Sequence, residues 1–224
     1  MTPAERWLAA ISPVVRTHLP SPPARVLELG CGSLGGFVPM LRSGGYHATG
    51  IDPDAPDGSD YERTTFEDAA LPDRADAVVA SASLHHVEDP ADVVDRIAGV
   101  LVPGGALIVV EWAWEDFDEA TARWGFDRLG TSPGHGWLER HRENWLASGV
   151  SWEVYLRDWA RREGLHGART LLELFEKRFE RVSLCRGPYV FADLPATDEA
   201  DEQRAIDRGE IRATRVDYVG RLAA

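Results

Sequence analysis

The sequence predicts an α/β fold in which helices cover both faces of a mostly parallel sheet. Short apolar segments alternate with helix-length segments through the first half of the chain. The apolar segments are continuous runs rich in Val, Ile and Ala, as in residues 75–83 and 106–111, which is typical of strands buried on both faces. The first apolar segment runs into a glycine-rich loop and then a helix-length segment, an order that predicts a βαβ unit.

The expected elements follow one another regularly from the N-terminus. Thr2, Pro3 and Glu5 have the pattern of a capping box with proline in the first turn, so a helix is expected within residues 1–20. Apolar runs between Gly, Pro and Asp clusters predict strands at 25–29, 46–52, 61–66, 75–83 and 106–111. Helical spacing predicts helices at 37–44 and 89–101, and the "PGG" of residues 103–105 predicts a turn.

The composition changes abruptly after Glu111. Seven of the eight tryptophans lie in a stretch of mostly helical pattern, at positions 112, 114, 124, 137, 145, 152 and 159. We therefore expect a Trp-rich helical cap inserted into the core. Beyond it, the pattern predicts a helix at 169–179, a strand at 180–185, a polar helix at 197–209 and a segment at 211–221 that alternates like an edge strand. The chain is expected to form one domain, with an N-terminal helix (1–20), a core (24–111), the cap (112–178) and C-terminal strands (179–224).

Charge and cysteine content argue against several classes of partner. The 224 residues contain 24 Lys and Arg against 37 Asp and Glu, a net charge of -13, so a nucleic-acid backbone would be repelled. Cys31 and Cys185 cannot form a disulfide framework or a metal-binding cluster, which favours a reducing cytoplasm and no metal. The apolar runs are much shorter than the roughly 20 residues that span a bilayer, so no membrane partner is expected.

The glycine-rich loop predicts a cofactor that contains adenosine. Gly30, Gly32 and Gly35 form GxGxxG between a strand and a helix, and Asp52 ends the next strand 20 residues after Gly32. Such a turn brings backbone N–H groups close to a ligand, and the carboxylate can accept both ribose hydroxyls. Glu28, two residues before the loop, would repel a pyrophosphate but suits an amino group, which argues against NAD.

Four segments, "VLELGCG", "GID", "LHHV" and "LVPGG", occur in the order found in class I S-adenosylmethionine-dependent methyltransferases, and the chain resembles this family over about residues 24–111 and the final strands. The resemblance implies a Rossmann-like sheet of seven strands in the order 3-2-1-4-5-7-6. Its last strand, within 211–221, would be antiparallel and lie between the fifth and sixth. The cofactor would be S-adenosyl-L-methionine and the product S-adenosyl-L-homocysteine. Leu34 departs from the family, which commonly has a third glycine at this position.

The resemblance also implies where each part of the cofactor would lie. The methionine part would be lined by the glycine loop with Glu28 at its amino end, Asp52 would bind the ribose, and Pro53 would lie against adenine. The acidic segment after the third strand would read the adenine amino group, and the end of the fourth strand would pass beneath the sulfonium. The full expected set is Glu28, Gly30, Cys31, Gly32, Gly35, Asp52, Pro53, Glu67, Asp68, Ala69, Ser81 and Ala82.

His85, His86 and Glu111 are the candidate catalytic residues. The histidines follow the fourth strand and Glu111 closes the fifth, so they are expected side by side at the ligand-binding edge. A histidine held by a carboxylate is a general-base arrangement, although these histidines could instead cap a helix or pack. In the cap, Trp137, His141 and Trp145 would share a helix face, and His135 could close over a substrate. Packing is the more common role of such residues.

These observations predict methyl transfer from S-adenosylmethionine to a small-molecule acceptor, with oxygen favoured over nitrogen or carbon. The surplus of indole rings in the cap favours an aromatic or otherwise apolar acceptor. Two alternatives stay open at this point. GxGxxG also permits an NAD-dependent oxidoreductase, and an intact cofactor loop is compatible with a non-catalytic protein that only binds S-adenosylmethionine.

Overall fold

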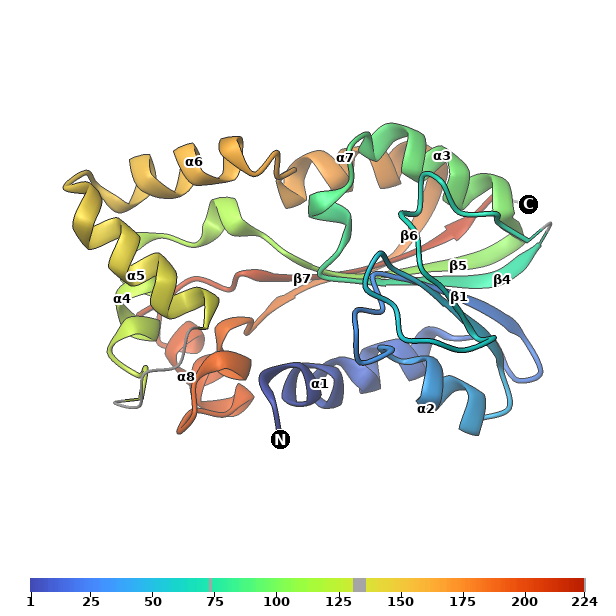
Figure 1. Cartoon of the computed structure of the whole chain (residues 1–224), viewed down its shortest axis with the longest axis horizontal. Coiled ribbons are helices and arrows are strands. Elements are labelled where there is room, and N and C mark those ends of the chain that lie inside the picture. The colour runs from blue at the N-terminus through green and yellow to red at the C-terminus, as the bar shows by residue number, and fades with distance from the viewer. Residues whose placement is uncertain (73, 131–135, 224) are drawn as a thin grey trace.

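The computed structural model describes residues 1–72, 74–130 and 136–223, and within them one sheet of seven strands forms the centre of the molecule (Figure 1). The strand order is β3-β2-β1-β4-β5-β7-β6. Neighbours from β3 to β5 are parallel, and β7 is antiparallel to both β5 and β6. The predicted fold class, strand order and reversed last strand are confirmed. The strands are β1 Arg25–Leu29, β2 His47–Ile51, β3 Tyr61–Glu62, β4 Ala75–Ser81, β5 Leu101–Trp112, β6 Phe179–Gly187 and β7 Arg215–Leu222.

Two pairs of helices cover the sheet on opposite faces (Figure 1). α3 (Pro90–Val100) and α7 (Ala168–Arg178) pack on one face, and α1 (Pro3–His18) and α2 (Val38–Ser43) on the other. The predicted capping box of α1 is present, because the Thr2 and Glu5 side chains each accept from the other's backbone N–H. The sheet is therefore the middle layer of three, as continuous apolar strands require.

The side chains of each central strand alternate between these two layers. In β1, Leu27 and Leu29 face α3 and α7, whereas Val26 faces α1 and α2. β4 repeats the pattern, with Val78 on the first face and Val79 on the second. This alternation has a functional consequence, because it fixes which strand residues can reach a ligand on a given face.

The tryptophan-rich region forms a separate helical layer beyond the carboxyl ends of the strands (Figure 1). Its buried rings form one hydrophobic cluster centred on Trp152, to which η3 (Val190–Asp193) and α8 (Glu199–Asp207) also contribute. α7 packs on the sheet with Leu171 and Phe175 although it falls within the range 112–178 expected for the cap. The remaining elements are η1 Leu84–His86, η2 Trp114–Asp116, α4 Glu119–Phe126, α5 Trp137–Ser148, α6 Trp152–Arg162, η3 Val190–Asp193 and α8 Glu199–Asp207.

Two local expectations are wrong. The "PGG" of residues 103–105 is not a turn outside the sheet but lies inside β5, where Gly104 has φ +76° and the register with β4 shifts. The segment 211–221 does not supply an edge strand, because β7 has a neighbour on each side and β6 is the edge. Its alternation arises from Arg215 and Asp217, which are buried and pair with each other at 3.0 Å between Nε and Oδ1.

Trp152→Ala is expected to lower the free energy of unfolding by about 3–5 kcal/mol, because it removes a fully buried ring from the centre of the cap. Leu146→Ala removes a side chain of the same layer that is 66% exposed, and should change that free energy by no more than about 0.5 kcal/mol. Urea denaturation followed by circular dichroism measures both. Equal effects of the two substitutions would contradict the assignment of Trp152 as the centre of the cap.

Candidate active site

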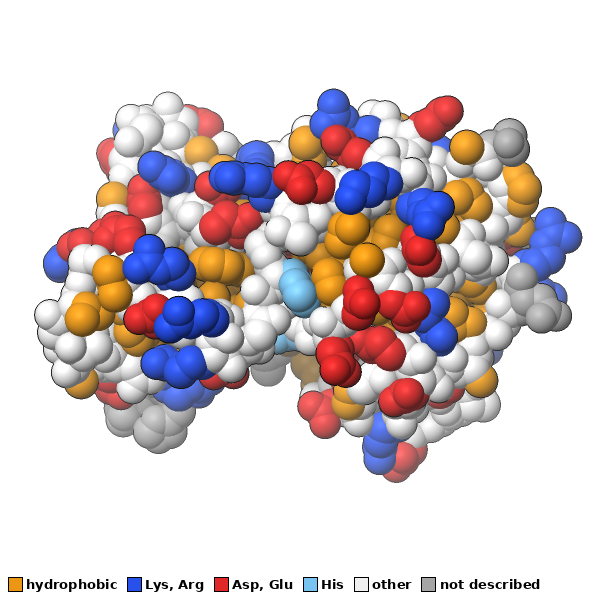
Figure 2. Space-filling view, turned by 90° about the horizontal axis from the view of Figure 1, so that it is seen from above, with side chains coloured by type: hydrophobic (Ala, Val, Ile, Leu, Met, Phe, Trp, Pro, Cys, Tyr) orange, Lys and Arg blue, Asp and Glu red, His pale blue; other side chains and the backbone are white. Residues whose placement is uncertain are grey.

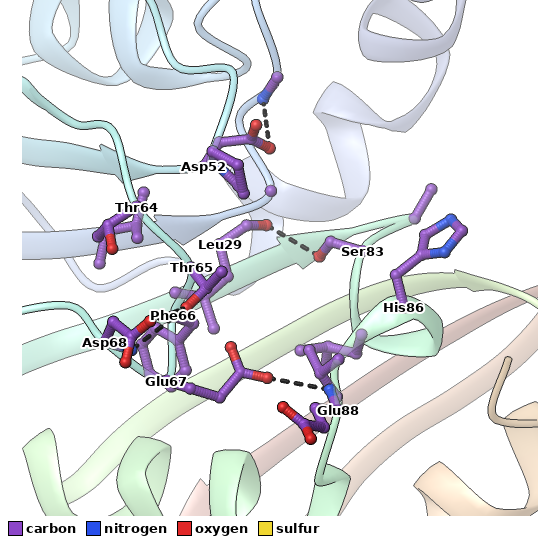
Figure 3. Close-up of a pocket in the computed structure, with 17 residues that line it drawn as sticks. Leu29, Asp52, Thr64, Thr65, Phe66, Glu67, Asp68, Ser83, His86 and Glu88 are labelled. Carbon is purple, nitrogen blue, oxygen red and sulfur yellow. Dashed lines mark hydrogen bonds between the residues drawn. The ribbon is translucent and has the colours of Figure 1, made fainter. Parts of the chain in front are cut away.

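The loop after β1 touches the segment after β4, and this contact requires glycine at position 30. Gly30 has φ +77°, and a Cβ there would lie 2.2 Å from Ser83 Cβ. The Ser83 hydroxyl donates to the Leu29 carbonyl oxygen at 3.0 Å (Figure 3). The two segments are thereby held in direct contact at the carboxyl edge of the sheet, where ligands bind in open α/β folds.

Gly32 and Asp52 are joined as the sequence pattern predicts. The Gly32 N–H donates to Asp52 Oδ2 at 2.9 Å, and the Asp54 N–H donates to Asp52 Oδ1 at 2.7 Å. A Cβ added to Gly32 would have no atom of the described residues within 4 Å, other than those of Gly32 itself and of its two neighbours in the sequence. Each carboxylate oxygen keeps a lone pair that can accept from a further donor. Figure 3 shows Asp52 at the edge of a cavity, with the hydrogen bond from the Gly32 N–H to its carboxylate.

The second half of the glycine loop is shaped by packing. A Cβ on Gly35 would lie 2.4 Å from the Tyr61 hydroxyl, and one on Gly36 would lie 2.0 Å from Glu28 Oε1. The Glu28 carboxylate accepts from the Phe37 N–H, with N···O distances of 2.9 and 2.7 Å. Glu28 is 1% exposed and stabilises the turn into α2 from beneath. Leu34, where the family commonly has glycine, is 58% exposed.

A cavity of about 580 Å³ opens between these loops, and it holds most of the predicted cofactor positions (Figure 3). Predicted residues that line it are Gly30, Gly32, Asp52, Pro53, Glu67, Asp68, Ala82 and His86. Lining residues that the sequence did not single out are Leu29, Ile51, Thr64, Thr65, Phe66, Ser83, Leu84, Val87 and Glu88. The volume lies within the range of small-molecule sites.

Five of the residues expected at the cofactor do not line this cavity: Glu28, Cys31, Gly35, Ala69 and Ser81. Glu28 and Ser81 lie on the other face of their strands, and the Ser81 hydroxyl oxygen accepts from Trp7 Nε1 at 2.9 Å. Cys31 is buried, and its Sγ would lie 2.8 Å from a Cβ on Gly50 of β2. Burial and the neighbouring Glu28 raise the pKa of this thiol to about 12.

The acidic segment after β3 forms one wall of the cavity. Glu67 Oε1 accepts from the Glu88 N–H at 3.0 Å, and Asp68 Oδ2 accepts from the Thr65 hydroxyl at 3.2 Å (Figure 3). Phe66, which directly precedes Glu67 in the sequence, contributes an apolar surface to the same wall. The wall therefore combines acceptors for an amino group with a face on which a flat ring can pack.

Glu111 organises the segment that follows β4. Its Oε1 accepts from the N–H groups of Ser83 at 2.9 Å and Leu84 at 2.6 Å, and its Oε2 lies 2.6 Å from His85 Nδ1. Burial disfavours the charged carboxylate, but the His85 ring and the two N–H donors outweigh burial and lower the pKa of Glu111. Ala82, just before this segment, has φ +49°, a conformation that non-glycine residues rarely adopt.

The two histidines differ in their surroundings. His85 is 4% exposed and held by Glu111, whereas His86 lines the cofactor-sized cavity. Burial and the neighbouring His85 lower the pKa of His86 to about 4, so its ring is neutral at pH 7. The two rings lie 4.1 Å apart between centroids. Of the two, His85 therefore has the geometry of an oriented base.

A second cavity, of about 330 Å³, lies beside the first, and His86 lines both. Its walls are aromatic: Trp112 lies 5.3 Å from Trp137 and stacks on Tyr189 at 5.6 Å between ring centroids. We refer to this cavity as the aromatic pocket; its lining residues are His85, His86, Trp112, Trp137, Arg140, His141, Trp159 and Tyr189. His135, expected to close over a substrate, lies outside the described residues. Trp145 packs on Trp152 in the cap and does not line the pocket.

Tyr189 is a pocket residue that the sequence did not reveal, and Glu202 of α8 fixes its position. The Glu202 carboxylate is fully buried and accepts from the N–H groups of Tyr189 at 2.8 Å and Phe191 at 2.7 Å, with Val190 between them also bonded. In the sequence, Glu202 is one of several acids in a polar helix, so no local pattern distinguishes it.

Comparison with known proteins identifies the class. Among solved structures, the fold is similar to an S-adenosylmethionine-dependent methyltransferase from Mesorhizobium loti, with a TM-score of 0.57 and 22% identity over 95% of this chain and 97% of that one. It is also similar to the N-methyltransferase NodS from Bradyrhizobium japonicum in complex with S-adenosyl-L-homocysteine, with a TM-score of 0.56 and 18% identity over 100% and 89%. The fold is thus that of S-adenosylmethionine-dependent methyltransferases.

The family follows from the sequence comparison. A family profile described as "Methyltransferase domain" matches residues 4–160, and the chain belongs to this family. A ubiquinone biosynthesis O-methyltransferase from Xylella fastidiosa is 37% identical over 126 residues, 47% of this chain and 50% of that protein. An uncharacterized methyltransferase from Mycobacterium bovis is 36% identical over 98 residues, 38% and 49% of the two chains. The chain spans about half the length of these curated relatives.

The predicted family is therefore confirmed, and the alternative of an NAD-dependent oxidoreductase is set aside. None of the described helices is long and apolar enough to cross a membrane. Within the part of the chain that the structure describes, no three His, Cys, Asp or Glu residues are grouped so that they could hold a metal ion.

Glu28 should make the stability of the protein depend on pH. Burial raises its pKa to about 8, so the folded protein keeps the proton that the unfolded chain loses near pH 4.5. The contribution of Glu28 to the free energy of unfolding is complete below about pH 4.5, and it is lost as the pH rises through about 8. Between pH 5 and 8, the free energy of unfolding of the wild type should fall by about 1–4 kcal/mol more than that of Glu28→Gln.

Urea titrations at several pH values measure this difference. Glu163→Gln, which changes an exposed acid on the cap, is the matched control and should follow the wild type. Parallel pH profiles for the wild type and Glu28→Gln would contradict the assignment of a protonated, buried Glu28.

Proposed function

We propose that the protein transfers a methyl group from S-adenosylmethionine to a hydroxyl oxygen of a flat, aromatic small molecule. The observation that carries this proposal is the meeting of the two cavities at His86, with the His85–Glu111 pair beside the junction. A cofactor in the first cavity and an acceptor in the aromatic pocket would face each other there. Metal plays no part in this proposal.

The residues around the first cavity fit an adenosyl cofactor. Asp52 would accept from the ribose hydroxyls, and Gly30 and Gly32 would let the methionine part pass close to the backbone. Pro53 and Phe66 would lie against adenine, with Glu67 or Asp68 accepting from its amino group. Ala82 would lie beneath the sulfonium. Glu28 and Cys31 would act indirectly, by shaping the loop that these groups contact.

The cofactor would supply a methyl group that is already activated on a sulfonium, so the chain mainly has to align the acceptor and exclude water. Such alignment can contribute up to about 7–11 kcal/mol. The acceptor oxygen would form a bond to the methyl carbon as the carbon–sulfur bond breaks, and the hydroxyl proton would pass to Nε2 of His85. Glu111, on Nδ1, would keep that ring in the required orientation and stabilise it once protonated.

The presence of His85 as a base favours oxygen as the methylated atom. A hydroxyl group must lose its proton during the reaction, whereas a neutral amine needs no deprotonation before attack. The curated relative from Xylella fastidiosa is named an O-methyltransferase, which supports the same choice, whereas NodS is named an N-methyltransferase. We also propose that the protein acts in a reducing cytoplasm, which the free thiols of Cys31 and Cys185 support.

Asp52→Ala should weaken binding of S-adenosylhomocysteine by about 1.5–3 kcal/mol, the scale of hydrogen bonds to a charged acceptor. Isothermal titration calorimetry measures the affinity, and circular dichroism verifies that the variant is folded. Asp54→Ala removes the neighbouring exposed acid, which does not line the cavity, and should bind like the wild type. An unchanged affinity in folded Asp52→Ala would remove the assignment of the ribose site.

His85→Ala should lower kcat by about 10²–10⁴, the usual contribution of a general base, and should leave affinity for S-adenosylhomocysteine nearly constant. The assay uses a phenol that the wild type methylates in a screened panel. His86→Ala should chiefly raise KM, because His86 lines both cavities and is held neutral. If His85→Ala retains activity within a few-fold of the wild type, the enzyme acts by alignment alone.

A further inference from the structure

Most side chains that line the aromatic pocket are uncharged at pH 7. Burial lowers the pKa values of His86 and His141 to about 4 and raises the pKa of Tyr189, and the other rings include three tryptophans. Arg140 is exposed and already has an interaction partner. In Figure 2, histidine side chains are visible in the furrow between the two lobes, whereas Asp, Glu, Lys and Arg side chains gather on the lobes. An uncharged acceptor therefore suits this pocket better than an ion.

His141 is buried in the wall of this pocket and is held from behind by Tyr155 of α6. Its side chain is 6% exposed, and its Nδ1 lies 2.9 Å from the Tyr155 hydroxyl oxygen. Tyr155 is not among the described lining residues, so Nδ1 points away from the pocket. The two nitrogens of an imidazole ring point in widely different directions, so Nε2 faces the pocket. Among the described residues, no atom hydrogen-bonds to Nε2, which is not one of the fully enclosed unpaired atoms and is therefore open to the cavity.

The surroundings of Tyr155 indicate which nitrogen of His141 carries the proton. Burial raises the pKa of Tyr155, and a hydrogen bond with the Asn144 side chain opposes that rise. A bond that favours the phenolate is one in which the Asn144 amide N–H donates, so the Tyr155 hydroxyl accepts from Asn144 and donates its own proton to Nδ1 of His141. A neutral imidazole whose Nδ1 accepts carries its proton on Nε2. From this hydrogen-bond network we assign an N–H donor of His141 that faces the pocket.

The tryptophans of the pocket separate His141 from His85. The Trp112 ring lies 6.3 Å from the His85 ring, 5.3 Å from Trp137 and 6.0 Å from Trp159, between centroids. The His141 ring contacts the same two tryptophans on their other side, at 5.5 Å from Trp137 and 4.4 Å from Trp159. A flat ring packed on these indoles would therefore have one edge toward His85 and another toward His141.

We infer that the acceptor is an uncharged hydroxyaryl carbonyl compound, whose carbonyl oxygen accepts from the Nε2–H of His141 while the hydroxyl that is methylated faces His85. This inference rests on the proposed function and names its substrate class. A ligand without the carbonyl would leave the buried N–H unpaired, which is how such a donor discriminates between similar molecules. A carbonyl conjugated with the ring also takes up negative charge as the hydroxyl loses its proton. The contact with His141 would then strengthen as the oxygen attacks the methyl group.

Matched pairs of ligands test this inference directly. The carbonyl compounds are 4-hydroxybenzaldehyde, 4-hydroxyacetophenone and 4-hydroxycinnamaldehyde. In the partner of each, a CH₂ group replaces the carbonyl oxygen, which keeps the shape and removes the hydrogen-bond acceptor. Binding to protein saturated with S-adenosylhomocysteine is measured by isothermal titration calorimetry. At least one carbonyl compound should bind roughly 5–100-fold more tightly than its hydrocarbon partner.

Two substitutions of His141 separate the roles of its ring nitrogens. His141→Asn keeps a polar group near the position of Nδ1, within reach of Tyr155, but removes the donor at Nε2, so it should abolish the preference. His141→Gln is the matched control, because its amide N–H reaches the position of Nε2, and it should keep most of the preference. Unchanged affinity for S-adenosylhomocysteine verifies that both variants are folded.

Absence of a preference in every pair of ligands, or an equal preference in the two variants, would overturn the inference. Nitrogen chemical shifts of the His141 ring, measured by NMR, should show a neutral ring protonated on Nε2, and protonation on Nδ1 would also overturn it. If the wild type binds no S-adenosylhomocysteine, the proposed function itself fails, and the two failures are thus distinct.

Discussion

The carboxylate of Glu111 is the interaction on which the rest of the site depends. It lies at the end of β5, beside the end of β4, and it satisfies two backbone N–H groups of the segment after β4 together with the ring of His85. That segment carries Ser83, which packs against Gly30, and both histidines. One buried charge therefore fixes the wall between the cavities. Without its donors, the same carboxylate would be strongly destabilising.

Glu111 is one of three buried glutamates that hold irregular backbone around the site. Glu28 accepts from the N–H of Phe37 after the glycine loop, and Glu202 accepts from three consecutive N–H groups beginning at Tyr189. The chain leaves regular structure at each of these places, so its N–H groups need other acceptors. A buried carboxylate can accept several such bonds at once. We interpret the acids as the framework of the site, and the aromatic rings and Asp52 as its contact surface.

Much of the fold follows from patterns within single segments. Continuous apolar runs predict the parallel strands, and the glycine loop with Asp52 predicts one side of the first cavity. The approach of His85 to Glu111 is predicted too, because adjacent parallel strands end at the same edge. The order of the last two strands came from family resemblance, since the local pattern of 211–221 indicated an edge.

Other features depend on the direction of individual side chains or on contacts between distant segments. Glu28 and Ser81, which belong to the predicted cofactor set, do not line the first cavity, because alternation along their strands turns both side chains toward the opposite face. Tyr189 reaches the aromatic pocket through the packing of η3 against α8, which no local pattern encodes. Phe66 directly precedes Glu67 and Asp68, and no local pattern distinguishes it as a residue of the cavity. Such features are properties of the assembled tertiary structure.

A crystal structure of the protein with S-adenosylhomocysteine tests most directly whether the two cavities meet beside the His85–Glu111 pair. We expect the ribose hydroxyls on Asp52 and the thioether sulfur near Ala82, facing the aromatic pocket at His86. A complex in which the nucleoside lies away from Asp52, or in which protein separates the sulfur from the aromatic pocket, would contradict it.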